Sequence, residues 1–363
     1  MPERVVVAMS GGVDSSVAAA LLKDEGYNVV GVTMHIWDVP DNDNIRSCCG
    51  YKAISDAQRV CAKLDIPFYT IDVKDIFKEK VIDDFCAEYP KARTPNPCIR
   101  CNQFIKFEYL LNKAKELKAD KIATGHYAKV EFDSNKKRWL LKKGIDEKKD
   151  QSYVLYTMTQ KQLSQTLFPV GNMNKSEVRA IAKKLDLLVA DKPDSQEICF
   201  IPDNNYPKFL MERLKHKPMP GKFLNTKGEV IGKHPGIIYF TIGQRRRIGI
   251  ASDEPLFVIK IDYKSNNIIV GSEKQAHGRK FFAHDLNYIS IARLNKPINA
   301  SVKIRYTHTP AKANIKPITD KEVSVEFVEP QWAITPGQAV VFYDKDLVIG
   351  GGTIDKNLQV DNS

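Results

Sequence analysis

Apolar runs and amphipathic segments alternate along the first half of the chain. Short β-branched and apolar runs, typical of buried strands, occupy the start of Val5–Ser16 and then Asn28–Met34, Pro67–Val73 and Lys121–Thr124. Helical spacing of apolar positions covers Asp14–Lys23, Lys52–Leu64 and Ile76–Tyr89. Strands separated by segments of helix length predict an α/β fold with a doubly wound parallel sheet, whose ligand lies at the carboxyl ends of the strands.

The second half of the chain has a different pattern. Two more helical segments, Lys175–Leu185 and Tyr206–Leu214, precede short β-rich runs that begin at Gly221. These runs predict a small β domain, and the later ones predict a C-terminal β-barrel. Gly350–Gly352 lies among the later strands, where a bulge or kink is expected. We therefore expect three domains, with bounds 1–205, 206–275 and 276–363.

The stretch Val5–Ser16, VVVAMSGGVDSS, passes directly from a strand into a glycine pair, an aspartate and two serines. The glycines allow the amides of Ser10–Val13 to converge on an anion, and the following helix N-terminus faces the same anion. Gly26 is expected as a left-handed C-cap. The chain has no GxxxxGK[ST] sequence here, and no lysine follows the glycines. The stretch predicts a phosphate loop; the alternative is an ordinary glycine turn.

Cysteines give a second candidate site. In RTPNPCIRCNQFIKF, Arg93–Phe107, two prolines exclude a helix before Cys98, so that Cys98 and Cys101 would open a helix. A helix N-terminus lowers a thiol pKa. The CxxC sequence has three interpretations: half of a zinc site, a redox dithiol pair, or a chance spacing. The lack of a second CxxC or CxxH argues against a structural zinc site. Cys199 follows in the same predicted domain, within KPDSQEICFIP.

Composition narrows the class of protein. The 363 residues are 43% hydrophobic and carry a net charge of +11, which favours a polyanionic partner. No apolar stretch reaches the roughly 18 residues that span a bilayer, and a strand signal begins within four residues of the N-terminus. We expect a soluble cytoplasmic protein with no membrane partner. Its seven cysteines argue for reduced thiols rather than a disulfide framework.

Seven motifs together resemble the bacterial tRNA-specific 2-thiouridylase family, which belongs to the ATP pyrophosphatases. They run in the family's order over nearly the whole chain: SGGVDSS, TPNPCIRCNQFIKF, TGHYA, KDQSYVLY, DSQEICFIP, FTIGQRRRIGI and ITPGQAVVFYD. The resemblance implies ATP-dependent replacement of the C2 oxygen of the wobble uridine, position 34, by sulfur in tRNAs for Lys, Glu and Gln. ATP would adenylate that oxygen, and a persulfide would deliver the sulfur.

The resemblance also implies roles for particular residues. Cys199 would carry the persulfide, and Cys101 would be the nucleophile that completes transfer by forming a disulfide with it. ATP contacts would come from Ala8, Met9, Ser10, Gly11, Gly12, Val13, Asp14, Ser15, Met34 and Gly125, with Mg²⁺ near Asp14. The target base would meet Asn96, Pro97 and Cys98; tRNA would meet Lys149, Asp150, Gln151, Arg305 and Tyr306. The sulfur donor would be a cysteine desulfurase or a sulfur relay protein.

Cys98 departs from the family pattern, because the family often has Asp at this position. Cys98, Cys101 and Cys199 could therefore supply three thiolates to an iron–sulfur cluster, an alternative that we do not favour. Two other functions remain open: a different adenylating ligase with SGGxDS, and a non-catalytic RNA-binding protein. The charged clusters Lys136–Arg138, Lys142-Lys143 and Arg245–Arg247 are either phosphate contacts or solvated faces.

Overall fold

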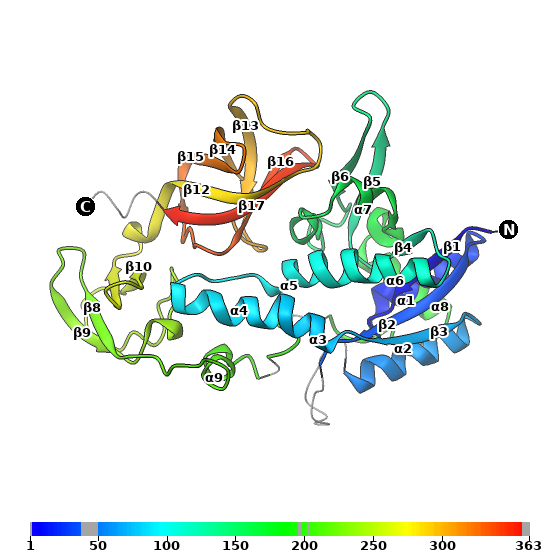
Figure 1. The fold of residues 1–363 in the computed structure, drawn as a ribbon, viewed down its shortest axis with the longest axis horizontal. Helices are drawn as coiled ribbons and strands as arrows, with labels where there is room; N and C mark the ends of the chain where they lie inside the picture. The colour runs from blue at the N-terminus through cyan, green and yellow to red at the C-terminus, as the bar shows by residue number, and fades with distance from the viewer. Residues whose placement is uncertain (1, 38–49, 195–197, 202, 358–363) are drawn as a thin grey trace. The chain divides into compact units, whose positions relative to one another are not determined.

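The computed structural model describes residues 2–37, 50–194, 198–201 and 203–357, and the chain divides into two compact units. Unit 1 comprises 1–81, 97–205 and 346–348; unit 2 comprises 82–96, 206–345 and 349–363. Figure 1 labels the elements along the chain. Among the described residues, no helix is both long and apolar enough to cross a membrane.

A five-stranded parallel sheet forms the centre of unit 1, in the order β3-β2-β1-β4-β7. Its strands are β1 Arg4–Ala8, β2 Asn28–His35, β3 Phe68–Asp72, β4 Lys121–Ala123 and β7 Thr166–Leu167. Both neighbours of β1 run parallel to it, and Val5, Val6 and Val7 are completely buried. A strand buried on both faces needs cover on both sides, which accounts for its continuous apolar run.

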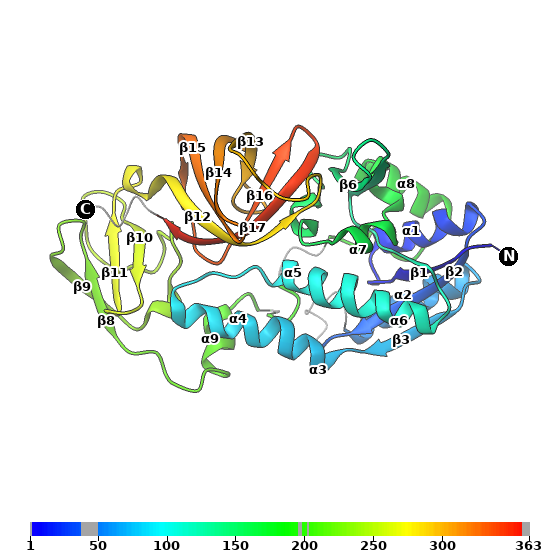
Figure 2. The same cartoon turned by 45° about the horizontal axis from the view of Figure 1, so that its top comes forward.

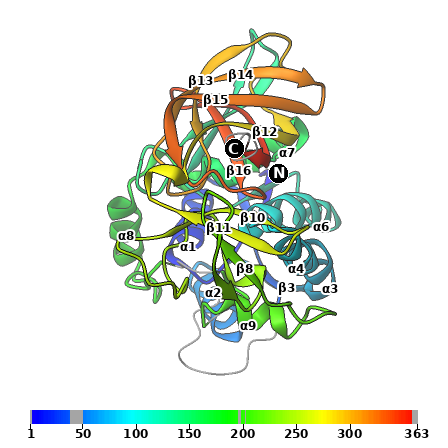
Figure 3. The ribbon, with the colours of Figure 1, turned by 90° about the vertical axis from the view of Figure 1, so that its left-hand side faces the viewer.

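Helices cover both faces of this sheet. Val5 and Val7 of β1 share a core with α1 Val13–Asp24, α2 Tyr51–Lys63 and α8 Lys175–Lys184. In Figure 3, α1 and α8 lie on one side and α6 Leu110–Glu116 on the other. The doubly wound parallel sheet predicted from the sequence is therefore confirmed, and Gly26 has the expected positive φ of 87°.

The remaining elements of the first half are mostly short. They are α3 Lys74–Phe77, the π-helix Lys78–Ile82, α4 Asp83–Glu88, the 3-10 turn Tyr89–Lys91, α5 Pro97–Arg100, the π-helix Cys101–Tyr109, a hairpin of β5 Ala128–Asp133 and β6 Arg138–Lys143, the 3-10 turns Ser152–Leu155 and Pro169–Asn172, and α7 Gln160–Ser164. The hairpin was not predicted, although β5 alternates apolar with charged positions. Lys142 pairs with Glu131 and Lys136 with Asp133, so two of its lysines have partners within the hairpin.

Unit 2 contains a small mixed sheet of order β10-β11-β8-β9, with parallel and antiparallel neighbours (Figure 2). The elements are α9 Tyr206–Met211, β8 Gly221–Leu224, β9 Val230–His234, the 3-10 turn Ile237–Tyr239, β10 Phe257–Asp262, β11 Asn267–Gly271 and the 3-10 turn Lys274–Ala276. The β-rich run GIIYFTIGQ does not form the strand that its composition suggested. Gly236 has φ of 155° and starts the 3-10 turn instead.

The rest of unit 2 is a closed barrel of order β12-β15-β14-β13-β16-β17, in which β12 also pairs with β17. Its strands are β12 His277–Tyr288, β13 Ile298–Lys303, β14 Ala311–Thr319, β15 Glu322–Trp332, β16 Ala339–Asp344 and β17 Leu347–Asn357. Gly350 and Gly352 lie in β17, and an added Cβ would stand 2.4 Å from Asn287 O and 2.6 Å from His284 O. The register shifts here, so the expected barrel irregularity is confirmed.

Candidate active site

Hydrogen bonds hold the loop between β1 and α1 in a compact turn. Ser10 N donates to Ser15 Oγ at 3.2 Å, and Ser16 Oγ donates to Gly12 O at 2.9 Å. Thr33 Oγ1 on β2 donates to Met9 O at 2.7 Å, which anchors the entry to the loop. The side chains at the start of α1 thus hold the loop, and α1 begins at Val13 with its first amides toward the loop.

Two glycines are required by close contacts around this loop. Gly11 has φ of 64°, and a Cβ there would lie 2.4 Å from Ala53 O of α2. A Cβ on Gly125, just after β4, would lie 2.5 Å from Asp14 C and Ser15 N. Gly125 therefore packs directly against the backbone that starts α1. Met34, only 6% exposed near the end of β2, lies at the same carboxyl edge of the sheet.

The Asp14 carboxylate contacts two side chains from distant parts of unit 1. Tyr127 Oη donates to Asp14 Oδ1 at 2.7 Å, and Lys175 Nζ contacts Asp14 Oδ1 at 2.7 Å and Oδ2 at 2.8 Å. Burial, followed by the negative charge of Asp14, raises the pKa of Tyr127 well above its usual value. The phenol therefore remains a donor to the carboxylate at all ordinary pH values.

Asp194 is the second carboxylate of this cluster. Its oxygens accept from Lys175 at 2.8 Å, Lys149 at 2.7 Å and Arg179 at 3.3 Å. Burial alone would raise the pKa of Asp194, but the hydrogen bonds from Lys149 and Lys175 outweigh it and lower the pKa to about 2. We call Asp14, Asp194, Lys149, Lys175 and Arg179 the charge cluster.

Lys192 connects the same stretch of chain to the phosphate loop. Its Nζ donates to Gly11 O at 2.7 Å and to Asp56 Oδ2 of α2 at 2.8 Å. Arg179 of α8 donates to Ala190 O at 2.7 Å and to Lys192 O at 3.0 Å. The segment that leads to Cys199 is therefore tied both to the loop and to α8.

The sequence pointed to neither Lys175 nor Lys192. Each meets its carboxylate partner across more than a hundred residues, at separations of 161 for Lys175 with Asp14 and 136 for Lys192 with Asp56. The helix start at Asn174 was visible as an N-cap with Glu177 three residues later, which is a capping-box signature. That signature places Lys175 at the first helical position but does not indicate its partner.

Cys101 and Cys199 are both half-buried and both belong to unit 1, whereas Cys98 is exposed. Cys98 and Cys101 lie at the start of a helix as predicted, but this helix begins at Pro97, one residue before Cys98, because proline is tolerated at the first position of a helix. Cys101 starts a nine-residue π-helix, a rare conformation that often accompanies functional sites. Ser195–Glu197 and Pro202, within the Cys199 motif, lie outside the described residues.

Cys61 provides a contrast among the thiols. It is 1% exposed beneath β2, and burial raises its pKa to about 12. A Cβ on Gly31 would lie 2.4 Å from its Sγ, so the thiol fills the space above that glycine. Cys61 is a core residue, as its position on the apolar face of the helix predicted.

Lys149, Asp150 and Gln151, which are expected to contact tRNA, have side chains that bind other residues of unit 1. Lys149 pairs with Asp194, and Asp150, 7% exposed, accepts from the amides of Gly144 and Ser152. Gln151 Oε1 accepts from Tyr127 N at 3.0 Å. An RNA contact by these residues remains a prediction. Such a contact would come from their backbone atoms, or from Lys149 if its ammonium left Asp194 for an RNA phosphate.

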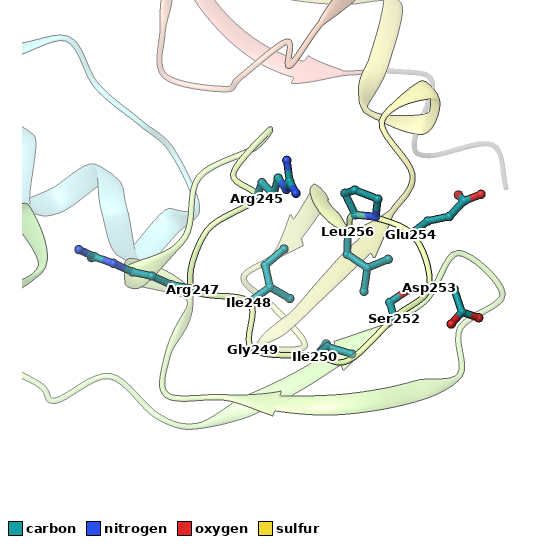
Figure 4. Close-up of a pocket in the computed structure, with 10 residues that line it drawn as sticks. Arg245, Arg247, Ile248, Gly249, Ile250, Ser252, Asp253, Glu254 and Leu256 are labelled. Carbon is teal, nitrogen blue, oxygen red and sulfur yellow. The ribbon is translucent and has the colours of Figure 1, made fainter.

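The other expected tRNA contacts lie in unit 2. Arg305 donates to Trp332 O at 2.8 Å, and Tyr306 is 39% exposed with Lys303 above its ring. Asn96 is half-buried at the end of the 82–96 segment. Arg245 and Arg247 border a pocket of about 320 Å³. In Figure 4 the aliphatic side chain of Ile248 faces the hollow, while Arg247 extends away from it.

The donor set at Asp14 fits Mg²⁺ held together with a nucleotide. Mg²⁺ in such sites takes one or two carboxylates and completes its shell with phosphate oxygens and water. Asp14 supplies one such carboxylate, which also contacts the Lys175 ammonium. Within the described ranges, no group of three or more His, Cys, Asp or Glu side chains is placed to hold a metal ion without further ligands.

Three family profiles match successive parts of the chain. They are described as the tRNA methyl transferase HUP domain over residues 3–203, the tRNA methyl transferase PRC-barrel domain over 207–272, and the aminomethyltransferase beta-barrel domain over 278–354. The fold and the site therefore define a HUP-domain protein with two β-rich domains after it.

Relatives of nearly the same length as this chain identify its family. The chain is 52% identical to the tRNA-specific 2-thiouridylase MnmA of Acetivibrio thermocellus, covering 97% of this chain and 99% of that protein. It is 53% identical to the tRNA-specific 2-thiouridylase MnmA of Heliobacterium modesticaldum, covering 99% of this chain and 94% of that protein. The chain belongs to the tRNA-specific 2-thiouridylase family.

The chain also has a weak similarity to a solved structure, a 4-thiouridine synthetase–RNA complex with bound ATP. It covers 58% of this chain and 50% of its own, with 15% sequence identity and a TM-score of 0.37.

Proposed function

We propose that this protein is an ATP-dependent tRNA-uridine 2-sulfurtransferase, which converts the wobble uridine of tRNAs for Lys, Glu and Gln into 2-thiouridine. The observation that carries the proposal is the phosphate loop at the carboxyl edge of the sheet, in a chain whose full-length relatives are named tRNA-specific 2-thiouridylases. Mass spectrometry of nucleosides from tRNA treated with enzyme, ATP and a persulfide donor tests it.

The first step would activate the C2 oxygen, which is a poor leaving group. That oxygen attacks the α-phosphorus of ATP, and the bond between the α- and β-phosphates breaks to release pyrophosphate. The amides of Ser10–Val13 and the N-terminus of α1 would stabilise the charge that develops on the departing pyrophosphate. Asp14 would hold Mg²⁺, which would supply further positive charge to the phosphates when bound.

The second step would exchange oxygen for sulfur. The terminal sulfur of a Cys199 persulfide attacks C2, and AMP leaves with the original oxygen. The Cys101 thiolate then attacks Cys199 Sγ; a Cys101–Cys199 disulfide forms while the electron pair of the broken S–S bond moves to the sulfur on C2. A thiol reductant must reduce this disulfide before the next turnover. The half-buried positions of both cysteines in unit 1 support this assignment.

The binding of tRNA should depend steeply on salt. A net charge of +11 supports phosphate contacts, and each neutralised phosphate releases counterions. We expect a plot of log affinity against log salt to be linear with a slope several units negative, measured by filter binding or fluorescence anisotropy. A flat response would show that the basic surface is not the tRNA-binding face.

The change Cys98→Asp separates the persulfide route from the cluster alternative. Asp replaces a soft ligand by a hard one, so an iron–sulfur cluster held by Cys98, Cys101 and Cys199 would be lost. For the persulfide route we expect anaerobically purified protein to be colourless, and thiolation to stay within about tenfold of wild type, since Cys98 takes no part in bond exchange. A brown wild-type protein that loses iron, colour and activity together in the variant would overturn that route.

Two other functions make different predictions for the same protein. A different adenylating ligase would turn over after its thiols are blocked, whereas the proposed enzyme would not. A non-catalytic RNA-binding protein would form no AMP at all. Measuring AMP with and without tRNA, before and after alkylation, distinguishes all three.

A further inference from the structure

The phosphate loop itself contains no lysine, but the fold brings one to its edge. Lys175 is the first residue of α8, after the N-cap Asn174, and its backbone N donates to Asp146 Oδ2 at 2.9 Å. Its side chain is only 11% exposed, and its Nζ lies 2.7 and 2.8 Å from the two oxygens of Asp14. A buried ammonium next to the loop where phosphate is expected calls for a function beyond stabilising the fold, because buried charges are costly.

The surroundings of Lys175 hold charged groups of both signs and the positive end of a helix. The charge cluster contains three cations, Lys149, Lys175 and Arg179, and two carboxylates, Asp14 and Asp194. The N-terminus of α1 adds further positive potential at Asp14. A third carboxylate, Asp146, accepts from Lys175 N, so carboxylates and cations are equal in number here. The positive end of α1 is what favours a further anion, such as a phosphate group, beside the Lys175 ammonium.

The partners of Asp194 allow Lys175 to change contacts at low cost. If Lys175 turned from Asp194 Oδ1 to a phosphate oxygen, Asp194 would still be paired with Lys149 at 2.7 Å and Arg179 at 3.3 Å. No carboxylate would be left buried without a partner, which is the usual large penalty for breaking such a pair.

We propose that Lys175 is a phosphate-binding residue of this site, whose ammonium contacts the β- and γ-phosphates of ATP, and that Asp194 is a positioning residue for it. This inference rests on the proposed function, because it assumes that ATP binds at the phosphate loop. It supplies, from a helix 161 residues away, the cation that a P-loop carries within its own sequence.

Comparing ATP with AMP tests this assignment directly. Lys175→Met should weaken Mg-ATP binding about 10- to 100-fold, the range for one lost charge-assisted bond, and change AMP binding less than about twofold. Isothermal titration calorimetry without tRNA measures both. The matched control is Lys183→Met on the same helix, where Lys183 is 61% exposed and forms an ion pair with the exposed Asp191. We expect the control to bind both nucleotides like wild type, since surface pairs contribute little.

Two further variants address the fold and the geometry. Lys175→Gln keeps donors without the charge and should also lose ATP affinity, whereas Lys175→Arg should recover part of it. Asp194→Asn should weaken ATP binding less than Lys175→Met, because Asp14 still holds the ammonium.

The possible failures are distinguishable. An equal loss of ATP and AMP affinity in Lys175→Met would make the residue structural, and unchanged ATP affinity would refute the phosphate contact while leaving the proposed function intact. A wild-type protein that binds no ATP would instead overturn the proposed function, and this inference with it.

Discussion

Replacing either Cys199 or Cys101 by serine should eliminate sulfur transfer to tRNA while leaving the affinities for ATP and tRNA within about twofold of wild type. A serine hydroxyl cannot carry a persulfide, and its alkoxide is far too basic to act as the second nucleophile at neutral pH. The two variants should fail at different points. With Cys199→Ser no persulfide forms on the protein, whereas Cys101→Ser should accept sulfur but not complete its release. Mass spectrometry of protein and tRNA measures both.

Cys61→Ala is the control for these variants. It also removes a thiol, but one that is 1% exposed in the core and has a raised pKa. We expect a lower melting temperature from the lost packing and unchanged thiolation per folded molecule. If Cys101→Ser or Cys199→Ser retained substantial thiolation, the altered cysteine would be structural and its role in the proposed mechanism would be wrong.

The second large effect is expected for Asp14→Ala. The change removes the carboxylate that holds Lys175, accepts from Tyr127 and is proposed to hold Mg²⁺. Formation of AMP should fall at least about 100-fold, the size of effect seen when charge stabilisation is lost from a phosphate-transfer site. A tRNA-dependent AMP assay measures it, with circular dichroism to check the fold.

Asp24→Ala makes the matched comparison, because Asp24 is the exposed last residue of the same helix. It should adenylate like wild type. Near-normal AMP formation by Asp14→Ala would remove the phosphate loop from the mechanism.

Much of the fold could be predicted because its determinants are local. The run Val5–Ala8, the glycine pair and Gly26 define a strand, a turn and a helix end through the conformations that those residues favour. The local hydrophobic pattern failed to predict strands that contain a proline or many charged residues. Strand β14 contains Pro317, and the β5–β6 hairpin alternates charged with apolar positions.

The charge cluster could not be predicted for a different reason. Periodicity locates elements, but the pairing of Lys175 with Asp14 and of Lys192 with Gly11 and Asp56 depends on which helix ends meet at the edge of the sheet. A lysine at a helix start is usually solvated, and nothing near Lys175 in the sequence indicates a partner. Long-range electrostatic contacts therefore became visible only in three dimensions.

A single-turnover transfer experiment tests the central claim most directly, namely that this protein couples ATP cleavage at the phosphate loop to sulfur transfer from Cys199. The enzyme is loaded with ³⁵S from a cysteine desulfurase and freed of the donor, and ATP and unmodified tRNA are then added. We predict that label moves from Cys199 to 2-thiouridine only when ATP is present, with one AMP formed for each sulfur transferred. Transfer without ATP, AMP formation without transfer, or an enzyme that takes up no label at Cys199 yet thiolates tRNA would contradict the account.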